Sequence, residues 1–131
     1  MSEIVKTEAV VLSKMDYRDT SSILSVYTKD YGKISVILKG VRNPKSKKGF
    51  VAEPLNHLHI IIYRKDSREL QLLSSADLIS HFPRIKEDLD RLKYSLAILE
   101  LVKNLTPDNE VNTRLFNGLS LIHISEPTRP Y

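Results

Sequence analysis

The hydrophobic residues of the first eighty positions recur with a period of two, and this pattern most restricts what the chain can fold into. In residues 33–41, Ile34, Val36 and Leu38 fall on one face of an extended chain, and residues 55–63 repeat the alternation. A period of two is typical of a half-buried β-strand. We therefore predict five strands, in residues 7–15, 21–28, 33–41, 55–63 and 68–79.

The segments between these stretches have the composition of tight connections. Residues 29–33 place Gly32 where a positive φ would end a hairpin turn, and residues 64–69 form a polar turn before the last stretch. Five short strands at this spacing favour a small closed barrel, because closure removes exposed sheet edges. We predict a mainly β fold with some α, namely a five-stranded Greek-key barrel of the OB-fold type in residues 1–82.

At Pro83 the period changes from two to that of a helix. Ile85, Leu89, Leu92, Leu96, Leu99 and Val102 recur every three or four residues, and Thr106-Pro107 would end the helix. A second helix is predicted from about Asn112. We assign residues 83–118 to the truncated start of a helical domain and residues 119–131 to an irregular tail outside the native sequence, since the tail has no sustained period.

The charge of the chain is concentrated in one segment. The net charge is +4, and residues 39–50 alone carry five basic residues and no acidic one. Such a segment indicates a polyanionic partner, and a solvated loop kept charged for solubility is the alternative. The 131 residues contain no cysteine and no long apolar run, so we expect a cytoplasmic protein without disulfides or thiolate metal sites.

The basic segment fits a nucleic-acid backbone, because each cation can neutralise one phosphate. It lacks the glycine and lysine spacing of a nucleotide-binding P-loop. Phe50 and Tyr63 are candidates for stacking against unpaired bases, with ordinary packing as the alternative. The predicted phosphate-binding residues are Lys39, Arg42, Lys45, Lys47 and Lys48.

Catalytic and metal-binding patterns are weak. His57 and His59 share one face of a strand, but no third ligand accompanies them there, so we predict no metal site and no cofactor. We interpret both histidines as polar-face residues that face the helical part. No nucleophile–histidine–acid arrangement stands out, and the sequence therefore predicts a protein that is not an enzyme.

Residues 4 to about 118 resemble the N-terminal part of RecO, the bacterial recombination mediator. The match rests on residues 7–28, 31–47, 53–55 and 88–116, and residues 32–47 are its most specific part. The resemblance implies an OB-fold domain that binds single- and double-stranded DNA, followed by a helical domain. It also implies a nucleoid-associated protein that anneals strands, displaces single-stranded-DNA-binding protein and helps RecR load the recombinase RecA. The four-cysteine zinc site of some members has no counterpart here.

Two other functions remain open from the sequence. One is an RNA-binding OB module, which should use the 2′-hydroxyl and so distinguish RNA from DNA of the same sequence. The other is a protein-interaction scaffold whose basic segment docks on an acidic protein surface. A nuclease is a more distant alternative, which metal-dependent cleavage of DNA would reveal.

Overall fold

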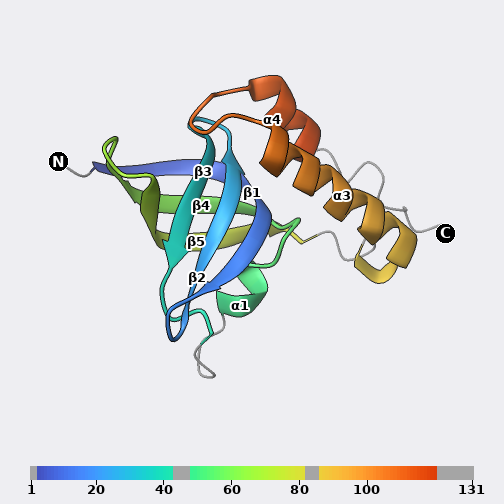
Figure 1. Ribbon diagram of the computed structural model, residues 1–131, viewed down its shortest axis with the longest axis horizontal. Helices are drawn as coiled ribbons and strands as arrows, with labels where there is room; N and C mark the ends of the chain where they lie inside the picture. The colour runs from blue at the N-terminus through green and yellow to red at the C-terminus, as the bar shows by residue number, and fades with distance from the viewer. Residues whose placement is uncertain (1–2, 43–47, 82–85, 121–131) are drawn as a thin grey trace.

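The computed structural model describes residues 3–42, 48–81 and 86–120. A β-barrel forms one side of the molecule, two helices lie against its flank, and a short helix lies at its lower end (Figure 1). The elements in chain order are β1 (Glu3–Tyr17), β2 (Ser21–Thr28), β3 (Gly32–Leu38), α1 (Lys48–Val51), β4 (His57–Arg64), β5 (Leu70–Ser80), α3 (Leu89–Leu105) and α4 (Thr113–Ser120).

The five strands close into a barrel in the order β1-β2-β3-β5-β4, which confirms the predicted Greek-key OB-type fold. Only β3 and β5 pair in parallel, and all other neighbours are antiparallel. β1 is longer than predicted, because residues from Glu3 onward pair with the end of β4. A register shift between Val11 and Ser13 lets β1 bend from β4 to β2 and close the barrel.

The barrel interior holds the main hydrophobic core. The predicted inward faces are confirmed: Ile34, Val36 and Leu38 of β3 are buried, as are Leu58, Ile60 and Ile62 of β4. β5 contributes Leu73 to the same core. Since successive side chains of a strand point to opposite faces, each strand fills the interior with every second residue.

A second core lies between the outside of the barrel and the two long helices (Figure 1). It explains why residues 7–15 are apolar on both faces: Val11 points into the barrel, whereas Val10 points outward toward the helices. Both are fully buried. The members of this second core are Val10, Leu12, Tyr27, Leu55, Leu99, Val102, Phe116 and Leu119.

The helices agree with the prediction in place but not in detail. Asp88 caps the start of α3 and Thr106 its end, while the predicted start at Pro83 lies outside the described residues. Leu89 and Leu96, which we predicted on the packed stripe, are exposed. α4 extends to Ser120, two residues beyond the predicted helical segment, and residues 121–131 lie outside the described residues.

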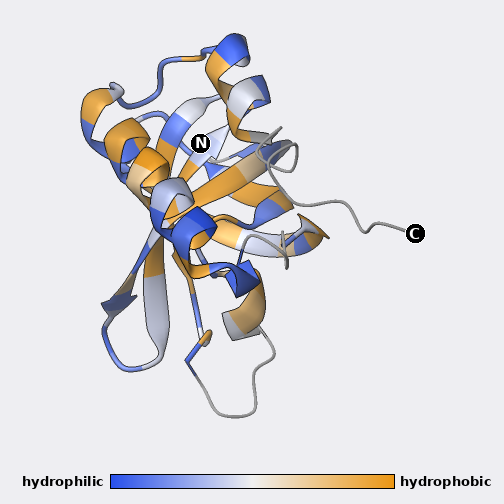
Figure 2. Cartoon of the chain, turned by 90° about the vertical axis from the view of Figure 1, so that its right-hand side faces the viewer, coloured by the Kyte–Doolittle hydropathy of each residue, from blue (hydrophilic) through white to orange (hydrophobic). Residues whose placement is uncertain are grey.

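The exposure of Leu89 and Leu96 has a simple geometric cause. The buried residues of α3 are Ser95, Leu99 and Val102, so the barrel covers only a narrow strip of the helix. Figure 2, which views the molecule from the side of the helices, shows hydrophobic and hydrophilic residues alternating along the helical ribbons. No helix in the described part of the chain is long and apolar enough to cross a membrane.

Candidate nucleic-acid interface

The basic segment begins where β3 ends, at the lower end of the barrel in Figure 1. Of the five predicted phosphate-binding residues, Lys39 is described and exposed, and Arg42 is described with its side-chain contacts. Lys45 and Lys47 lie outside the described residues, as does the side chain of Lys48. The segment is also less of a loop than predicted, because α1 begins at Lys48.

Gly40 and Val41 fix how the segment leaves the barrel. Gly40 has a φ of 70°, the left-handed region that favours glycine, and a Cβ there would meet open space. Val41 is buried in the main core and anchors the chain immediately afterwards. Lys39 is therefore held at the barrel rim between Leu38, which ends β3, and the buried Val41.

Arg42 joins the basic segment to the turn between β1 and β2. Its backbone N–H donates to the carbonyl of Thr20 at 2.8 Å, and its Nε donates to the carbonyl of Ser21 at 3.1 Å. Its Nη2 donates to the carbonyl of Arg18 at 2.5 Å, and its Nε lies 3.5 Å from Asp16 Oδ1. We predicted Arg42 as a phosphate ligand, but most of its visible contacts hold the protein together.

Arg18 is a basic residue that the sequence analysis did not select. It has a φ of 56°, and its guanidinium carbon lies 5.0 Å from the centre of the Tyr17 ring, a cation–π arrangement. Because Arg42 bonds to the Arg18 carbonyl, the β1–β2 turn is fixed beside the basic segment. In the sequence Arg18 is an arginine in a short polar turn, and nothing in that turn indicates that it lies beside Arg42.

Most other cations of the barrel are paired with acidic groups. Lys14 lies 2.8 Å from Glu53, and Arg64 lies 2.7 Å from Asp66. Within the described residues Lys39 and Arg18 form no ion pair, and neither do Lys6, Lys65 and Arg68. The lower end of the barrel therefore carries two cations, Lys39 and Arg18, without an ion-pair partner among the described residues, beside Arg42, which pairs with Asp16. We call Lys39, Arg42 and Arg18 the cationic rim.

Phe50 lies at the lower end of the barrel, but its ring contacts are His81 and Lys86 rather than residues of the cationic rim. Phe50 lies on α1, is 53% exposed and contacts His81 edge-on, with 5.3 Å between ring centres. Lys86 Nζ lies 5.7 Å from its ring. Tyr63 lies near the end of β4, and in the sheet it shares a row with Leu72 of β5 and Ile37 of β3.

A shallow groove on the outer face of β1, β2 and β3 was also missed by sequence reasoning. Its lining is mixed apolar and polar, and Lys33 closes one end by donating hydrogen bonds to the carbonyls of Lys103 and Thr106, both at 2.5 Å. In OB-folds the face of strands two and three binds oligonucleotides. The strand residues of the groove are Ser13, Met15, Ile23, Ser25, Lys33 and Ser35.

The two histidines of β4 have different surroundings. His57 is buried, with Nε2 3.0 Å from Glu8 Oε1 and its ring edge-on to Phe116 of α4. The prediction that it faces the helical part is confirmed. His59 is exposed. The described residues contain no group of three potential ligands that could hold a metal ion.

Comparison with known proteins relates this geometry to a family. Residues 1–82 match the model of the recombination protein O N terminal family. Proteins named DNA repair protein RecO are similar along most of the chain. The one from Pelodictyon phaeoclathratiforme is 39% identical over 118 residues, which cover 89% of this chain and 45% of the relative. The one from Chlorobaculum parvum is 42% identical over 113 residues, covering 86% and 44%.

The similarity to a third relative reaches nearly the whole chain. The RecO protein of Prosthecochloris aestuarii is 38% identical over 130 residues, covering 98% of this chain and 49% of the relative. The chain thus spans about half the length of the curated relatives it matches. The five strands of the closed barrel lie within residues 1–82, the same residues that match the family model. The chain belongs to the RecO N-terminal family.

Proposed function

We propose that this chain is the DNA-binding part of a DNA repair protein. The observation that carries the proposal is the cationic rim, where positive charge lies at one end of an OB-type barrel without an acidic partner for Lys39 or Arg18 among the described residues. The names of the similar proteins, all DNA repair protein RecO, support the same function.

In this proposal the basic segment holds the sugar–phosphate backbone. Lys39, Lys45, Lys47 and Lys48 neutralise phosphates and release counterions, which gives affinity without reading sequence. Arg42 mainly positions the segment against the β1–β2 turn, from which Arg18 adds a further cation. Phosphate contacts of this kind serve single- and double-stranded DNA alike.

The finer role that we propose is recombination mediation at the bacterial nucleoid. The protein would anneal complementary strands and, with RecR and single-stranded-DNA-binding protein as partners, help a recombinase assemble on single-stranded DNA. Membership of the RecO N-terminal family supports this role. The proposal assigns no catalytic step to any residue, and the partner contacts are expectations for the longer proteins of the family.

The test is the salt dependence of binding to single-stranded DNA. The logarithm of affinity should fall linearly with the logarithm of salt concentration, with a slope of about −0.7 per neutralised phosphate. The double variant Lys47→Ala/Lys48→Ala should make the slope shallower by about 1.4, equally for strands of different sequence. A matched control, Lys29→Ala/Lys93→Ala, removes the same charge from the β2–β3 turn and from α3.

The outcomes separate the candidate functions. If both double variants reduce the slope equally, net charge rather than the basic segment controls binding, and the proposal fails. If the wild-type protein binds RNA much more tightly than DNA of the same sequence, the RNA-binding alternative is correct. A last outcome concerns competition by an acidic peptide. If the peptide displaces DNA from the wild type, but does not displace the DNA that the Lys47→Ala/Lys48→Ala variant still binds, the basic segment also binds proteins.

A further inference from the structure

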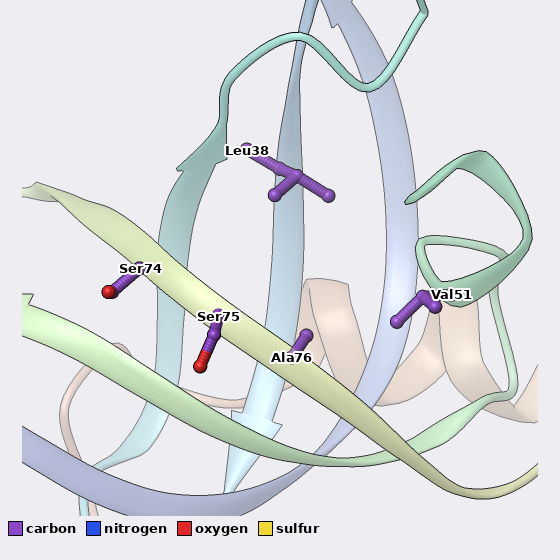
Figure 3. A pocket seen from close by; sticks show the side chains of 5 residues that line it. All are labelled: Leu38, Val51, Ser74, Ser75 and Ala76. Atoms are coloured by element: carbon purple, nitrogen blue, oxygen red, sulfur yellow. The ribbon is translucent and has the colours of Figure 1, made fainter. Parts of the chain in front are cut away.

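A small cavity opens at the lower end of the barrel, between the end of β3, α1 and β5 (Figure 3). Leu38, Val51 and Ala76 form apolar walls from three different elements, and Ser74 and Ser75 of β5 line its border. Its volume is about 140 Å³, several times the ~30 Å³ that one water molecule occupies in the liquid. This is room for one planar ring, and it is too small for a base pair.

One side of the cavity is an open sheet edge. β3 pairs with β5 only from Ser35–Leu70 to Ile37–Leu72, although β5 continues to Ser80. On its other edge β5 stays paired with β4 as far as Ser80. Beyond Leu72, the N–H and C=O groups on the β3 side of β5 therefore have no strand partner among the described residues. Such groups can donate to and accept from a ligand.

The cavity lies where the basic segment begins and ends, because two of its lining residues flank residues 39–50. Leu38, one of its walls, directly precedes Lys39, and Val51, another wall, ends the helix that starts at Lys48. Lys39, the first cation of the basic segment, therefore lies next to one wall of the cavity. The positive charge outside and the apolar walls inside match the two halves of a nucleotide, an anionic phosphate and a planar base.

A buried hydroxyl next to one wall has no partner. Ser22 lies directly opposite Leu38 in the β2–β3 pairing and is completely buried. Its Oγ makes no hydrogen bond within the described part of the chain. Buried polar groups in folded proteins nearly always have a partner. An unpartnered hydroxyl thus lies next to the Leu38 wall, although Ser22 does not itself line the cavity.

We propose that this cavity binds one unpaired base of the DNA strand whose phosphates the basic segment holds. The inference rests on the proposed function and adds a base site to it. The walls contact the two faces of the base, and the open edge of β5 bonds to its rim. A duplex keeps its bases stacked and paired, so it gains nothing from the cavity. The protein therefore prefers single-stranded to double-stranded DNA at equal numbers of phosphates.

The experiment compares three DNA ligands: a thymine single strand, an abasic single strand of equal length, and a duplex. The wild type should bind the thymine strand at least about 5-fold more tightly than the abasic strand, which is the lower limit for one stacked base. Ala76→Leu fills the cavity and should abolish this ratio while leaving the salt slope unchanged. Lys47→Ala/Lys48→Ala should reduce the slope and preserve the ratio.

A second cavity-filling variant, Val51→Phe, covers the case in which Ala76→Leu does not fold, and thermal unfolding shows which variants are folded. Equal wild-type affinity for thymine and abasic strands overturns the base site while leaving the phosphate-binding proposal intact. A folded filled-cavity variant that keeps the ratio overturns it as well. If Phe50→Ala removes the ratio and the filled cavity does not, the base lies on Phe50, and the cavity proposal is wrong. Absence of DNA binding by the wild type contradicts the proposed function itself.

Discussion

The barrel and the helical segment bury their hydrophobic residues in different ways. The barrel encloses its core between five paired strands, and Leu58, Ile60 and Ile62 are almost completely inaccessible. In α3, by contrast, Leu101 is 58% and Leu105 76% exposed. α3 thus carries more apolar residues than the barrel covers, whereas the core residues inside the barrel are all buried. The curated relatives are about twice as long as this chain.

The two regions still depend on each other. The outer face of the barrel carries Val10, Leu12 and Tyr27, which are buried only because α3 and α4 lie over them. The linker between these helices adds polar contacts, since the Asn109 N–H donates to the Lys33 carbonyl at 2.9 Å. We therefore predict that the core inside the barrel is self-contained and that the outer surface of α3 contributes little to stability. The second core, between the barrel and the helices, is shared by both regions, and we call it the seam.

The largest effect is expected inside the barrel. Ile60→Ala should lower the free energy of unfolding by about 2–5 kcal/mol, because it leaves a cavity in a closed core. The matched change Ile98→Ala, at a residue 47% exposed on α3, should stay within about 0.5 kcal/mol. Urea unfolding measures both. A loss above ~1.5 kcal/mol for Ile98→Ala would show that the outer face of α3 is covered in solution, for instance by self-association.

The next effect tests the seam. Gly32 has a φ of 70°, and a Cβ there would lie 2.3 Å from the Glu110 carbonyl oxygen. Gly32→Ala should cost about 2–4 kcal/mol, from left-handed strain plus displacement of the linker. Gly40→Ala is the control, since its φ is also 70° but its Cβ meets open space, and it should cost only about 1 kcal/mol. Equal losses would mean that the linker does not pack on this turn.

The sequence predicted the barrel well because alternation is a local property. Each strand shows which residues point inward, and the turn glycine at Gly32 has the expected positive φ. The helix was harder to interpret. Periodicity identifies residues that share a face, but it does not show how much of that face a neighbour covers. For this reason Leu99 was predicted correctly as packed, while Leu89 and Leu96 were not.

The candidate site was predictable only as a charge pattern. The run of cations is visible in the sequence, but the contacts of Arg42 with the β1–β2 turn depend on tertiary structure. The sequence also did not indicate that Tyr63 of β4 and Ile37 of β3 lie on either side of Leu72 of β5 in one row of the sheet. The cavity beside Leu38 exists because β3 and β5 pair over a short stretch, which no single-strand pattern encodes. Phosphate binding by the five predicted residues stays a prediction.

A smaller effect is expected at the start of α3. Asp88 Oδ1 accepts hydrogen bonds from the N–H groups of Asp90 at 3.1 Å and Arg91 at 3.2 Å. Asp88→Ala should cost about 1 kcal/mol, while Asp88→Asn keeps an acceptor and should cost much less. Urea unfolding followed by helical circular dichroism measures the loss. Separate helical and barrel transitions in Asp88→Ala would show that α3 unfolds independently, against the shared seam.

The smallest effect concerns a polar contact at the seam and depends on pH. Burial raises the pKa of Tyr27 above its ordinary value, and the nearby Glu110 carboxylate adds to this. The folded state therefore holds the phenol proton more tightly than the unfolded state. The resulting stability is fully present below about pH 10 and is lost as the pH rises from there toward the folded-state pKa.

Tyr27→Phe removes this titration together with a long hydrogen bond, 3.4 Å from the Tyr27 hydroxyl to the Glu110 carbonyl. At pH 7 the variant should lose no more than about 0.5–1 kcal/mol. Between pH 9 and about pH 11, its stability should fall less steeply than that of the wild type. Tyr94→Phe, at a residue 73% exposed, controls for the loss of one phenol. Urea unfolding at each pH gives the stability of both proteins. If the stabilities of Tyr27→Phe and wild type change in parallel with pH over this range, the Tyr27 hydroxyl is hydrated and the linker between α3 and α4 does not cover it.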